Sequence, residues 1–385
     1  MVLTFDRAEF EERLTRCRAS LSAHGLDALL LFRQESMYYL TGYDTSGYLY
    51  FQTLLVGSGG ALTLLTRSAD VASARLTSLI SDVRVRQEGG GARAANEIRT
   101  LLTDSGLAGK RVGIEFDAVG VTVSQGRHLT EAMDGFCEVV DASDLVADLR
   151  HVKSDAEIDC VRTSARLTQA ALEQANNLSV PGRRLASIRA TALAGAIEGG
   201  GDPPGVRWPM AAGETAQLAR YFTASGDRTV AANDQVTHEI GVPYRHYYTV
   251  VMNTLLVGQP DPRHRTMFHA AREALDAGRA SACAGQTFGA IHAAYAGTLR
   301  RLGFGDLVLN ACGYPLAATY PPTWVEQPII AANSTFVLRD RMVVFIYVVL
   351  QDAEHGLAMS LGETVLVNPG ANEALTHAPR ELLVH

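Results

Sequence analysis

The segment NDQVTHEIGVPYRHYYTVVMNTLLV, residues 233–257, decides the fold of this chain. It contains two runs of mainly apolar and β-branched residues, 235–241 and 247–257, which predict buried strands. A carboxylate, Glu239, lies inside the first run, where a charge is costly to bury unless it is paired or functional. Glu239 is therefore a candidate functional residue, with a structural ion pair or a solvated sheet edge as the alternative.

Other polar residues of the predicted strands have the same two interpretations. Because successive side chains of a strand point to opposite faces, Glu239 and Thr237 share one face. One face of the second run carries His246, Tyr248, Val250 and Met252. Tyr347 is the single polar residue of a third apolar run, 342–350. For His246 and Tyr347, the alternative to a catalytic role is a hydrogen-bonded residue of the core.

The rest of the second half combines helices with further strands. Ser154 and Glu157 have the spacing of a capping box and open a predicted helix that runs to about residue 176. Further helices are expected at 185–197, 262–277 and 288–302, and a further strand at 357–367. The sequence predicts an α+β domain with helices segregated from a curved antiparallel sheet.

The first 150 residues alternate helical and strand patterns instead. Helices are expected at 8–24, 69–80 and 92–105, and strands at 28–32, 83–85, 111–116 and 137–140. The runs 53–56 and 61–65 flank a glycine-rich turn and predict a hairpin. We therefore expect an α/β domain over residues 1–150 and the α+β domain over residues 151–385.

Composition narrows the classes of function. The chain has 385 residues and a net charge of −7, which disfavours nucleic-acid and membrane-surface partners. Its apolar runs are shorter than the ~20 residues needed to span a bilayer, and no signal peptide is recognised. Five widely spread cysteines without a C-x-x-C pair favour reduced thiols. We expect a cytoplasmic enzyme or small-molecule binder.

Several segments together resemble the creatinase/prolidase/methionine-aminopeptidase superfamily, whose C-terminal domain has the pita-bread fold. Residues 153–158, Lys-Ser-Asp-Ala-Glu-Ile, are similar to the K-S-x-x-E-I/L entry of that domain. Residues 233–257 resemble its G-D-x-V-x-x-D-x-G … Y-x-x-Y-x-x-D-x-x-R-T segment, and residues 342–367 its G-M-V-x-x-x-E … E-D-T-V-L-V segment. The resemblance covers nearly the whole chain and implies an α/β N-terminal domain followed by a pita-bread catalytic domain.

The departures from the family pattern concern metal binding. Peptidases of the family hold two metal ions with two Asp, one His and two Glu ligands. Carried over by motif, these positions are occupied by Glu239, Val250, Tyr314, Tyr347 and Gly362. Valine and glycine side chains supply no donor atoms, so a dinuclear site is not expected, even if a one-residue slip brings Glu363 to the position of Gly362. We expect no metal and no cofactor.

The superfamily also has metal-free branches, which include creatinase and ectoine hydrolase. Residues 37–44, Met-Tyr-Tyr-Leu-Thr-Gly-Tyr-Asp, are similar to a loop of ectoine hydrolases and of dimethylsulfoniopropionate lyases. In those relatives the loop reaches the active site of the partner subunit, which implies a homodimer with Tyr43 and Asp44 in the partner's pocket. The alternative is that the tyrosines of this segment pack the N-terminal domain.

The leading hypothesis is a metal-independent hydrolase of a non-peptide C–N bond in a small polar substrate, such as an amino-acid-like compound, an amidine or a guanidine. Glu239 would be the nucleophile or general base. Without a metal, side-chain donors must meet the developing negative charge, a role open to His246, Tyr314 and Tyr347. The expected substrate contacts are Arg220, Tyr221, Tyr248, Tyr43 and Asp44.

Three other functions remain open from the sequence. A lyase or isomerase in the same pocket would use Glu239 or a tyrosinate to abstract a proton, and would leave no water oxygen in the product. A non-catalytic binding module would also lack metal ligands. A metal-dependent Xaa-Pro peptidase is what fold analogy alone predicts, although the ligand positions disfavour it and fold does not fix function.

Overall fold

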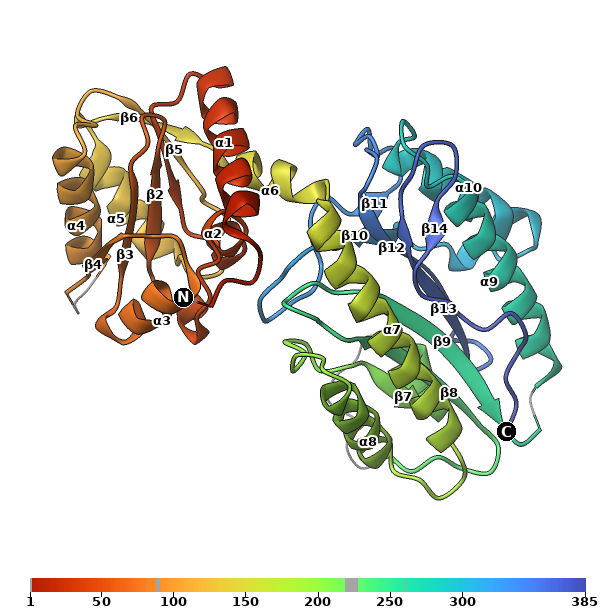
Figure 1. The fold of residues 1–385 in the computed structure, drawn as a ribbon. Coiled ribbons are helices and arrows are strands. Elements are labelled where there is room, and N and C mark those ends of the chain that lie inside the picture. The colour runs from red at the N-terminus through yellow and green to blue at the C-terminus, as the bar shows by residue number, and fades with distance from the viewer. Residues whose placement is uncertain (1, 88–90, 219–227, 260) are drawn as a thin grey trace. The chain divides into compact units, whose positions relative to one another are not determined.

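The computed structural model describes residues 2–87, 91–218, 228–259 and 261–385. The chain divides into two compact units, Met1–Arg150 and His151–His385. In both units, runs of small and branched apolar residues form strands, and helices cover them (Figure 1).

The N-terminal unit has an α/β architecture around a six-stranded mixed sheet. The strand order is β4-β3-β2-β1-β5-β6, with the β1–β2 and β2–β3 pairs antiparallel and the other pairs parallel. The strands are β1 (Ala28–Leu31), β2 (Thr53–Gly57), β3 (Leu62–Thr66), β4 (Asp82–Val85), β5 (Arg111–Ile114) and β6 (Glu138–Asp141). The expected hairpin at β2–β3 is confirmed.

Helices lie on both faces of this sheet. Leu29 and Leu31 of β1 pack into one apolar cluster, and Ala28 and Leu30 pack into another, as strand alternation requires. The helices are α1 (Arg7–Ala23), α2 (Gln34–Thr41), α3 (Val71–Thr77), α4 (Gly91–Asp104), α5 (Val123–Met133) and α6 (Ser143–His151). The sequence analysis did not predict α2, α5 or α6.

The C-terminal unit is built on one antiparallel sheet with the strand order β11-β10-β12-β13-β9-β8-β7, and β14 pairs with β13. Every pair within it is antiparallel, as expected. The strands are β7 (Met210–Ala212), β8 (Asp234–Gly241), β9 (Val250–Val257), β10 (Ala311–Pro315), β11 (Ile330–Ala331), β12 (Val343–Asp352), β13 (Leu357–Leu366) and β14 (Glu373–Ala374).

Two pairs of helices cover the sheet on one face (Figure 1). The capping box of Ser154 and Glu157 opens the first, as predicted. The helices are α7 (Asp155–Leu178), α8 (Leu185–Glu198), α9 (Pro262–Ala280) and α10 (Phe288–Arg301). Alternate residues of β12, such as Ile346 and Val348, pack with α9 and α10 in a large apolar cluster. Glu239 belongs to the opposite face, together with Tyr347. Its register partner is Met252, which pairs with Gly362, and Gly362 pairs with Tyr347.

A hydrogen bond across the sheet demonstrates its curvature. Tyr314 on β10 donates to Glu239 on β8 over 3.4 Å, although three strands lie between β10 and β8. In a flat sheet, four interstrand spacings of ~4.8 Å would hold the two backbones about 19 Å apart. Two side chains of this length cannot bridge that gap. The sheet is therefore curled, and Glu239 lies on its concave face.

The strand expected over 247–257 begins later, at Val250. Arg245 and His246 have positive φ angles of 52° and 68°, and Tyr244 and Tyr247 exchange backbone hydrogen bonds around them. Two consecutive residues with positive φ are the signature of a tight hairpin turn. This corrects the prediction that His246 and Tyr248 belong to the same strand face as Val250.

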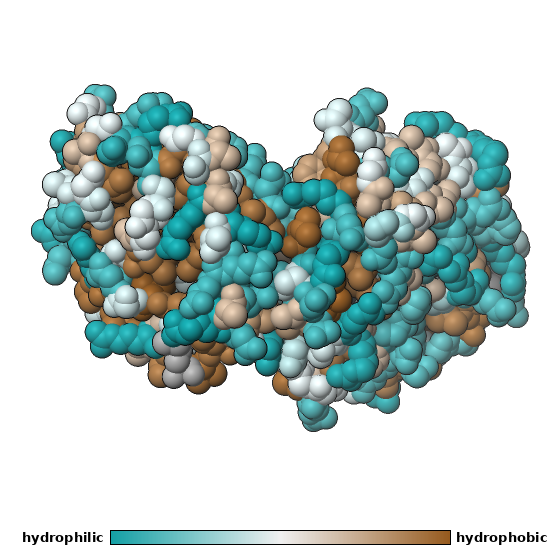
Figure 2. Space-filling model, turned by 45° about the horizontal axis from the view of Figure 1, so that its top comes forward, coloured by the Kyte–Doolittle hydropathy of each residue, from teal (hydrophilic) through white to brown (hydrophobic). Residues whose placement is uncertain are grey.

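The surface is mixed in character. On the face seen in Figure 2, hydrophilic residues are interspersed with hydrophobic ones on both units. Within the described ranges, no helix combines the length and the apolar character that crossing a membrane requires.

Candidate active site on the concave face

A row of four residues crosses the concave face. Glu239 on β8 pairs with Met252 on β9, Met252 with Gly362 on β13, and Gly362 with Tyr347 on β12. Directly opposed residues of antiparallel strands share a face, so the row brings Glu239 and Tyr347 to the same side. Glu239 and Tyr347 are each only 3% exposed. The site is thus a largely water-excluded part of the sheet.

Tyr314 completes this group from the far side of the sheet. It pairs with Phe345, two residues before Tyr347, and therefore shares the concave face. Its ring centroid lies 6.1 Å from that of Tyr347 and 5.4 Å from that of Phe345. Its hydroxyl is 3.4 Å from Glu239 Oε1. Of the predicted catalytic residues, Glu239, Tyr314 and Tyr347 are thus assembled in one place.

Trp324 is a member of this site that the sequence analysis missed. It precedes β11 in an irregular segment, is 4% exposed and donates its indole N–H to the Tyr314 hydroxyl over 2.9 Å. No motif or periodic pattern marks it. Only its chemical type, a tryptophan among polar and proline residues, is a signal that sequence reasoning could have used.

His246 and Tyr248 are placed by other contacts. The His246 ring stacks on Tyr320 with centroids 4.2 Å apart, and its backbone N–H donates to Asp202 over 3.0 Å. The Tyr248 hydroxyl accepts a hydrogen bond from the Gly205 backbone over 2.7 Å. Its ring lies 5.8 Å from that of Trp324, at the edge of the aromatic group. Tyr248 therefore borders the site, whereas His246 belongs to the hairpin turn.

Arg220 and Tyr221, two expected substrate contacts, lie outside the described residues. Two further expected contacts, Tyr43 and Asp44, belong to the N-terminal unit. Tyr43 is fully buried there, and its hydroxyl donates to Gln52 over 2.9 Å. Burial raises the pKa of Tyr43 to about 12. This corrects its expected place in a partner's pocket, because Tyr43 packs the core of its own unit.

Asp44 is half-buried, and its backbone N–H donates to Thr77 over 3.0 Å. The preceding residues are not the loop that was expected, because Gln34–Thr41 form α2. The helix ends at Gly42, whose φ of 82° is readily adopted only by glycine. The segment is thus a helix and its cap, fixed on the N-terminal unit.

The donor set at the concave face does not fit a two-metal centre. Among the positions that the resemblance assigns to metal ligands, Val250 and Gly362 offer no donor atom. The space at Gly362 is also filled, since a Cβ atom there would lie 2.5 Å from Phe345 Cζ. In the described part of the chain, no three His, Cys, Asp or Glu side chains are grouped to hold a metal.

A one-residue slip that places Glu363 in the site is excluded by the register. Gly362 pairs with Tyr347 and Met252 on the concave face, so the Glu363 side chain points to the helix side. There it is 1% exposed and accepts hydrogen bonds from Arg272 over 2.9 Å and Arg279 over 3.0 Å.

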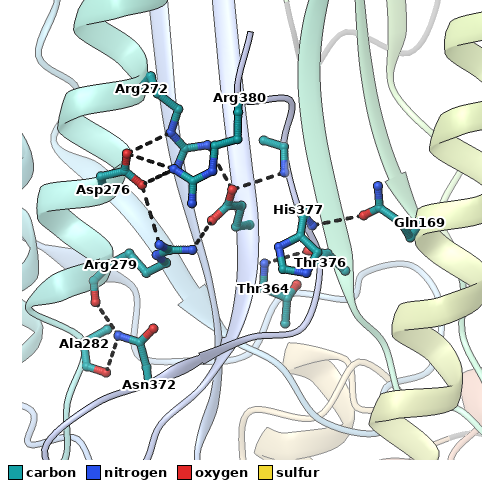
Figure 3. Close-up of polar contacts among 12 residues, drawn as sticks. Gln169, Arg272, Asp276, Arg279, Ala282, Thr364, Asn372, Thr376, His377 and Arg380 are labelled. Atoms are coloured by element: carbon teal, nitrogen blue, oxygen red, sulfur yellow. Dashed lines mark hydrogen bonds and ion pairs between the residues drawn. The ribbon is translucent and has the colours of Figure 1, made fainter.

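This helix-side group, Arg272, Asp276, Arg279, Glu363 and Arg380, forms one connected network. Figure 3 shows Arg272 and Asp276 side by side on α9, with Arg279 below them and Arg380 approaching from the C-terminal segment. Asp276 is 2.7 Å from Arg272 and 2.9 Å from Arg380. Charge-assisted hydrogen bonds of this kind hold β13, α9 and the C-terminal segment together.

His238, the neighbour of Glu239 on β8, also faces the helices. Its Nε2 atom lies 2.8 Å from Ser179 Oγ, at the end of α7. Burial, together with the nearby charge of Arg189, lowers the pKa of His238 to about 3. The imidazole is therefore neutral at neutral pH and is directed away from the concave face.

A curled antiparallel sheet with two helix pairs on its outer face, preceded by an α/β unit, is the two-domain pita-bread architecture. Residues 13–152 match the Creatinase/Prolidase N-terminal domain, and residues 159–369 match metallopeptidase family M24. The second match alone spans more than half of the chain. The chain therefore belongs to metallopeptidase family M24, a family of hydrolases in the creatinase/prolidase superfamily, as the sequence resemblance predicted.

Individual relatives are similar over their full length but distant. The chain is 26% identical to an uncharacterized hydrolase/peptidase of Sinorhizobium fredii, over all of this chain and 99% of that protein. It is 24% identical to the ectoine hydrolase of Halomonas elongata, over 99% and 98% of the two chains. The structure of an Xaa-Pro dipeptidase from Bacillus anthracis superposes with a TM-score of 0.83 at 21% identity, covering 98% of this chain and 100% of that one.

Proposed function

We propose that this protein is a metal-independent hydrolase of a non-peptide C–N bond in a small polar substrate, an amino-acid-like compound, an amidine or a guanidine. The observation that carries the proposal is the donor set of the concave face. One carboxylate, Glu239, remains with a tyrosine hydroxyl directed at it, where a two-metal hydrolase needs several ligands. The similarity to an ectoine hydrolase along the whole chain supports a non-peptide substrate.

The site has the parts that such a reaction needs. Glu239 acts as a general base on water or as the nucleophile, and its side chain is only 3% exposed. Negative charge that develops on the substrate requires hydrogen-bond donors in a dry pocket. The hydroxyl of Tyr347 on β12 supplies such a donor, whereas Tyr314 on β10 donates its proton to Glu239.

The test compares wild type and Glu239→Gln on amidines, guanidines, N-acyl amino acids and Xaa-Pro dipeptides. Each protein is assayed after chelation and again after loading with manganese, cobalt or zinc, with its metal content measured by elemental mass spectrometry. We expect turnover of a non-peptide substrate by chelated wild type, with 18O from labelled water in the product. Glu239→Gln should keep its fold, because the amide oxygen still accepts from Tyr314, and should lose turnover by at least ~10³-fold.

Other outcomes point to other functions. Stoichiometric metal with Xaa-Pro cleavage would contradict the proposal in favour of a peptidase. Product without 18O would indicate a lyase or isomerase. Binding without turnover in both proteins would indicate a non-catalytic module, and full activity in Glu239→Gln would remove Glu239 from the mechanism.

We further propose that the protein is a cytoplasmic homodimer. The N-terminal unit exposes Leu49 and Tyr50, two large residues with apolar surface, close in sequence to Asp44. Exposed apolar residues of this kind are suited to a contact between copies. All five cysteines are free, which suits a reducing compartment. Light scattering of the wild type should give a mass twice that of one chain. The double variant Leu49→Glu, Tyr50→Glu should have the mass of a single chain. A monomeric wild type would contradict the dimer.

A further inference from the structure

We propose that Trp324 is a positioning residue that directs the hydroxyl proton of Tyr314 onto Glu239. The inference rests on the proposed role of Glu239, since it concerns how that carboxylate is kept ready for reaction. It assigns a function to a residue that lies outside every motif of the sequence. The observations are two hydrogen bonds in series and the packing of one aromatic ring.

The direction of the hydrogen bonds follows from the chemistry of the groups. An indole N–H is a donor only, so the 2.9 Å contact from Trp324 must use an oxygen lone pair of Tyr314. The Tyr314 hydroxyl has one proton, and Glu239 Oε1, at 3.4 Å, is an acceptor when the carboxylate is ionised. The indole proton thus occupies one side of the Tyr314 oxygen, and the Tyr314 proton is donated to Glu239 on another side.

Packing holds the indole in this position. Gly241 is two residues beyond Glu239 on β8 and shares its face. A Cβ atom at Gly241 would lie 3.2 Å from Trp324 Cε3 and Cζ3, so the glycine leaves the space that the ring occupies. Tyr248 lies against the ring, with centroids 5.8 Å apart and its own hydroxyl held by Gly205. The ring is thus enclosed from two sides.

The arrangement has a consequence for the reaction. A hydrogen bond donated to a carboxylate favours its ionised form, which is the form needed for a base or nucleophile. Without the indole, the Tyr314 oxygen loses the donor that fixes one side of it, and its donation to Glu239 weakens. Trp324 therefore acts on Glu239 through Tyr314.

The experiment follows the indole N–H signals of the 15N-labelled protein by NMR between pH 4 and 9. The chain has two tryptophans, and Trp324→Phe identifies the signal of Trp324. Trp208 is the internal control, because its indole donates to the Gly241 backbone carbonyl over 2.7 Å, a group that does not titrate. We expect the Trp324 signal to shift with the ionisation of Glu239 and the Trp208 signal to stay constant.

Three variants test whether Tyr314 connects Trp324 to Glu239. Glu239→Gln should abolish the titration of the Trp324 signal, and Tyr314→Phe should move the signal and also abolish its titration. Tyr347→Phe, which removes a neighbouring hydroxyl, should leave the titration in place. The proposal is overturned by an unchanged titration in Tyr314→Phe, or by a Trp324 signal that is constant in wild type.

These readouts need no substrate, so they are independent of the proposed reaction. Once a substrate is identified, Trp324→Phe should move the acidic limb of the pH–rate profile to higher pH by up to about one unit, with KM nearly unchanged. A substrate screen that fails while the NMR titration succeeds would reject the reaction and leave the hydrogen-bond relay standing.

Discussion

The two faces of the C-terminal sheet each bury a glutamate, and the two carboxylates have different hydrogen-bond partners. On the helix side, Glu363 is neutralised by two arginines and also accepts the Ala378 backbone N–H over 3.2 Å. On the concave side, Glu239 is joined to the aromatic group through the phenol of Tyr314. Each carboxylate is at most 3% exposed.

The comparison separates structural from functional burial. An ion-paired and fully hydrogen-bonded carboxylate connects elements of the fold, and removal of one partner leaves charge stranded in the interior. On the concave face, Glu239 accepts a hydrogen bond from the phenol of Tyr314 within the proposed site. Gly362 and Glu363, which are adjacent in β13, thus face different environments: the proposed site on the concave face and the ion-paired network on the helix side.

The largest expected effect is on the helix side. Glu363→Gln should lower the free energy of unfolding by about 3–5 kcal/mol, because it leaves Arg272 and Arg279 without their shared carboxylate. Urea unfolding followed by circular dichroism measures the change.

A matched control tests whether burial causes the difference. Arg162 and Glu373 form a two-pronged ion pair at the surface, with side chains 48% and 40% exposed. Exposed pairs contribute about 0.2–1 kcal/mol, so Glu373→Gln should change stability only by that amount. Equal losses in Glu363→Gln and Glu373→Gln would contradict the structural role assigned to the buried network.

An effect on stability smaller than that of Glu363→Gln is expected from another buried glutamate, Glu115, in the N-terminal unit. It is 0% exposed and accepts hydrogen bonds from Ser36 Oγ over 2.5 Å and from the Phe32 and Arg33 backbone. Burial outweighs these bonds and raises the pKa of Glu115 to about 7. Its neutral form is thus favoured in the folded state.

The sign of the pH dependence follows. Between the unfolded pKa of about 4.5 and the folded pKa of about 7, the folded state binds more protons, so its stability falls as pH rises. At about 1.4 kcal/mol per unit, the loss approaches ~3 kcal/mol by pH 8. Urea unfolding at pH 5 and pH 8, with Glu115→Gln as the permanently neutral variant, measures it. A wild type as insensitive to pH as Glu115→Gln would show that Glu115 is ionised throughout.

Much of the fold could be predicted because its determinants are local. The capping box at Ser154, the β2–β3 hairpin and the apolar strand runs act through neighbouring residues. The hairpin turn at Arg245 and His246 was missed because neither residue is a glycine or asparagine, the usual signs of positive φ. The helix α2 was missed because its residues are buried nearly all round and show no amphipathic period.

The candidate site was predictable where it lies on strands. Glu239, Tyr314 and Tyr347 lie together because the register of the strands places them on one face. Strand alternation and motif spacing in the sequence were enough to name these three residues. Trp324 was not predictable, since its position depends on the curl of the sheet and the path of an irregular segment. The placement of Tyr43 was likewise decided by tertiary packing, in the core of the N-terminal unit.

The Phe345 ring beside Gly362 sets a condition for engineering this face of the sheet. A Cβ atom at position 362 would lie 2.5 Å from Phe345 Cζ, so any larger residue there has to displace the ring. Val250, on the same face, has no donor atom either. A designed metal site at these positions therefore needs a smaller residue at position 345 together with new ligands at positions 250 and 362.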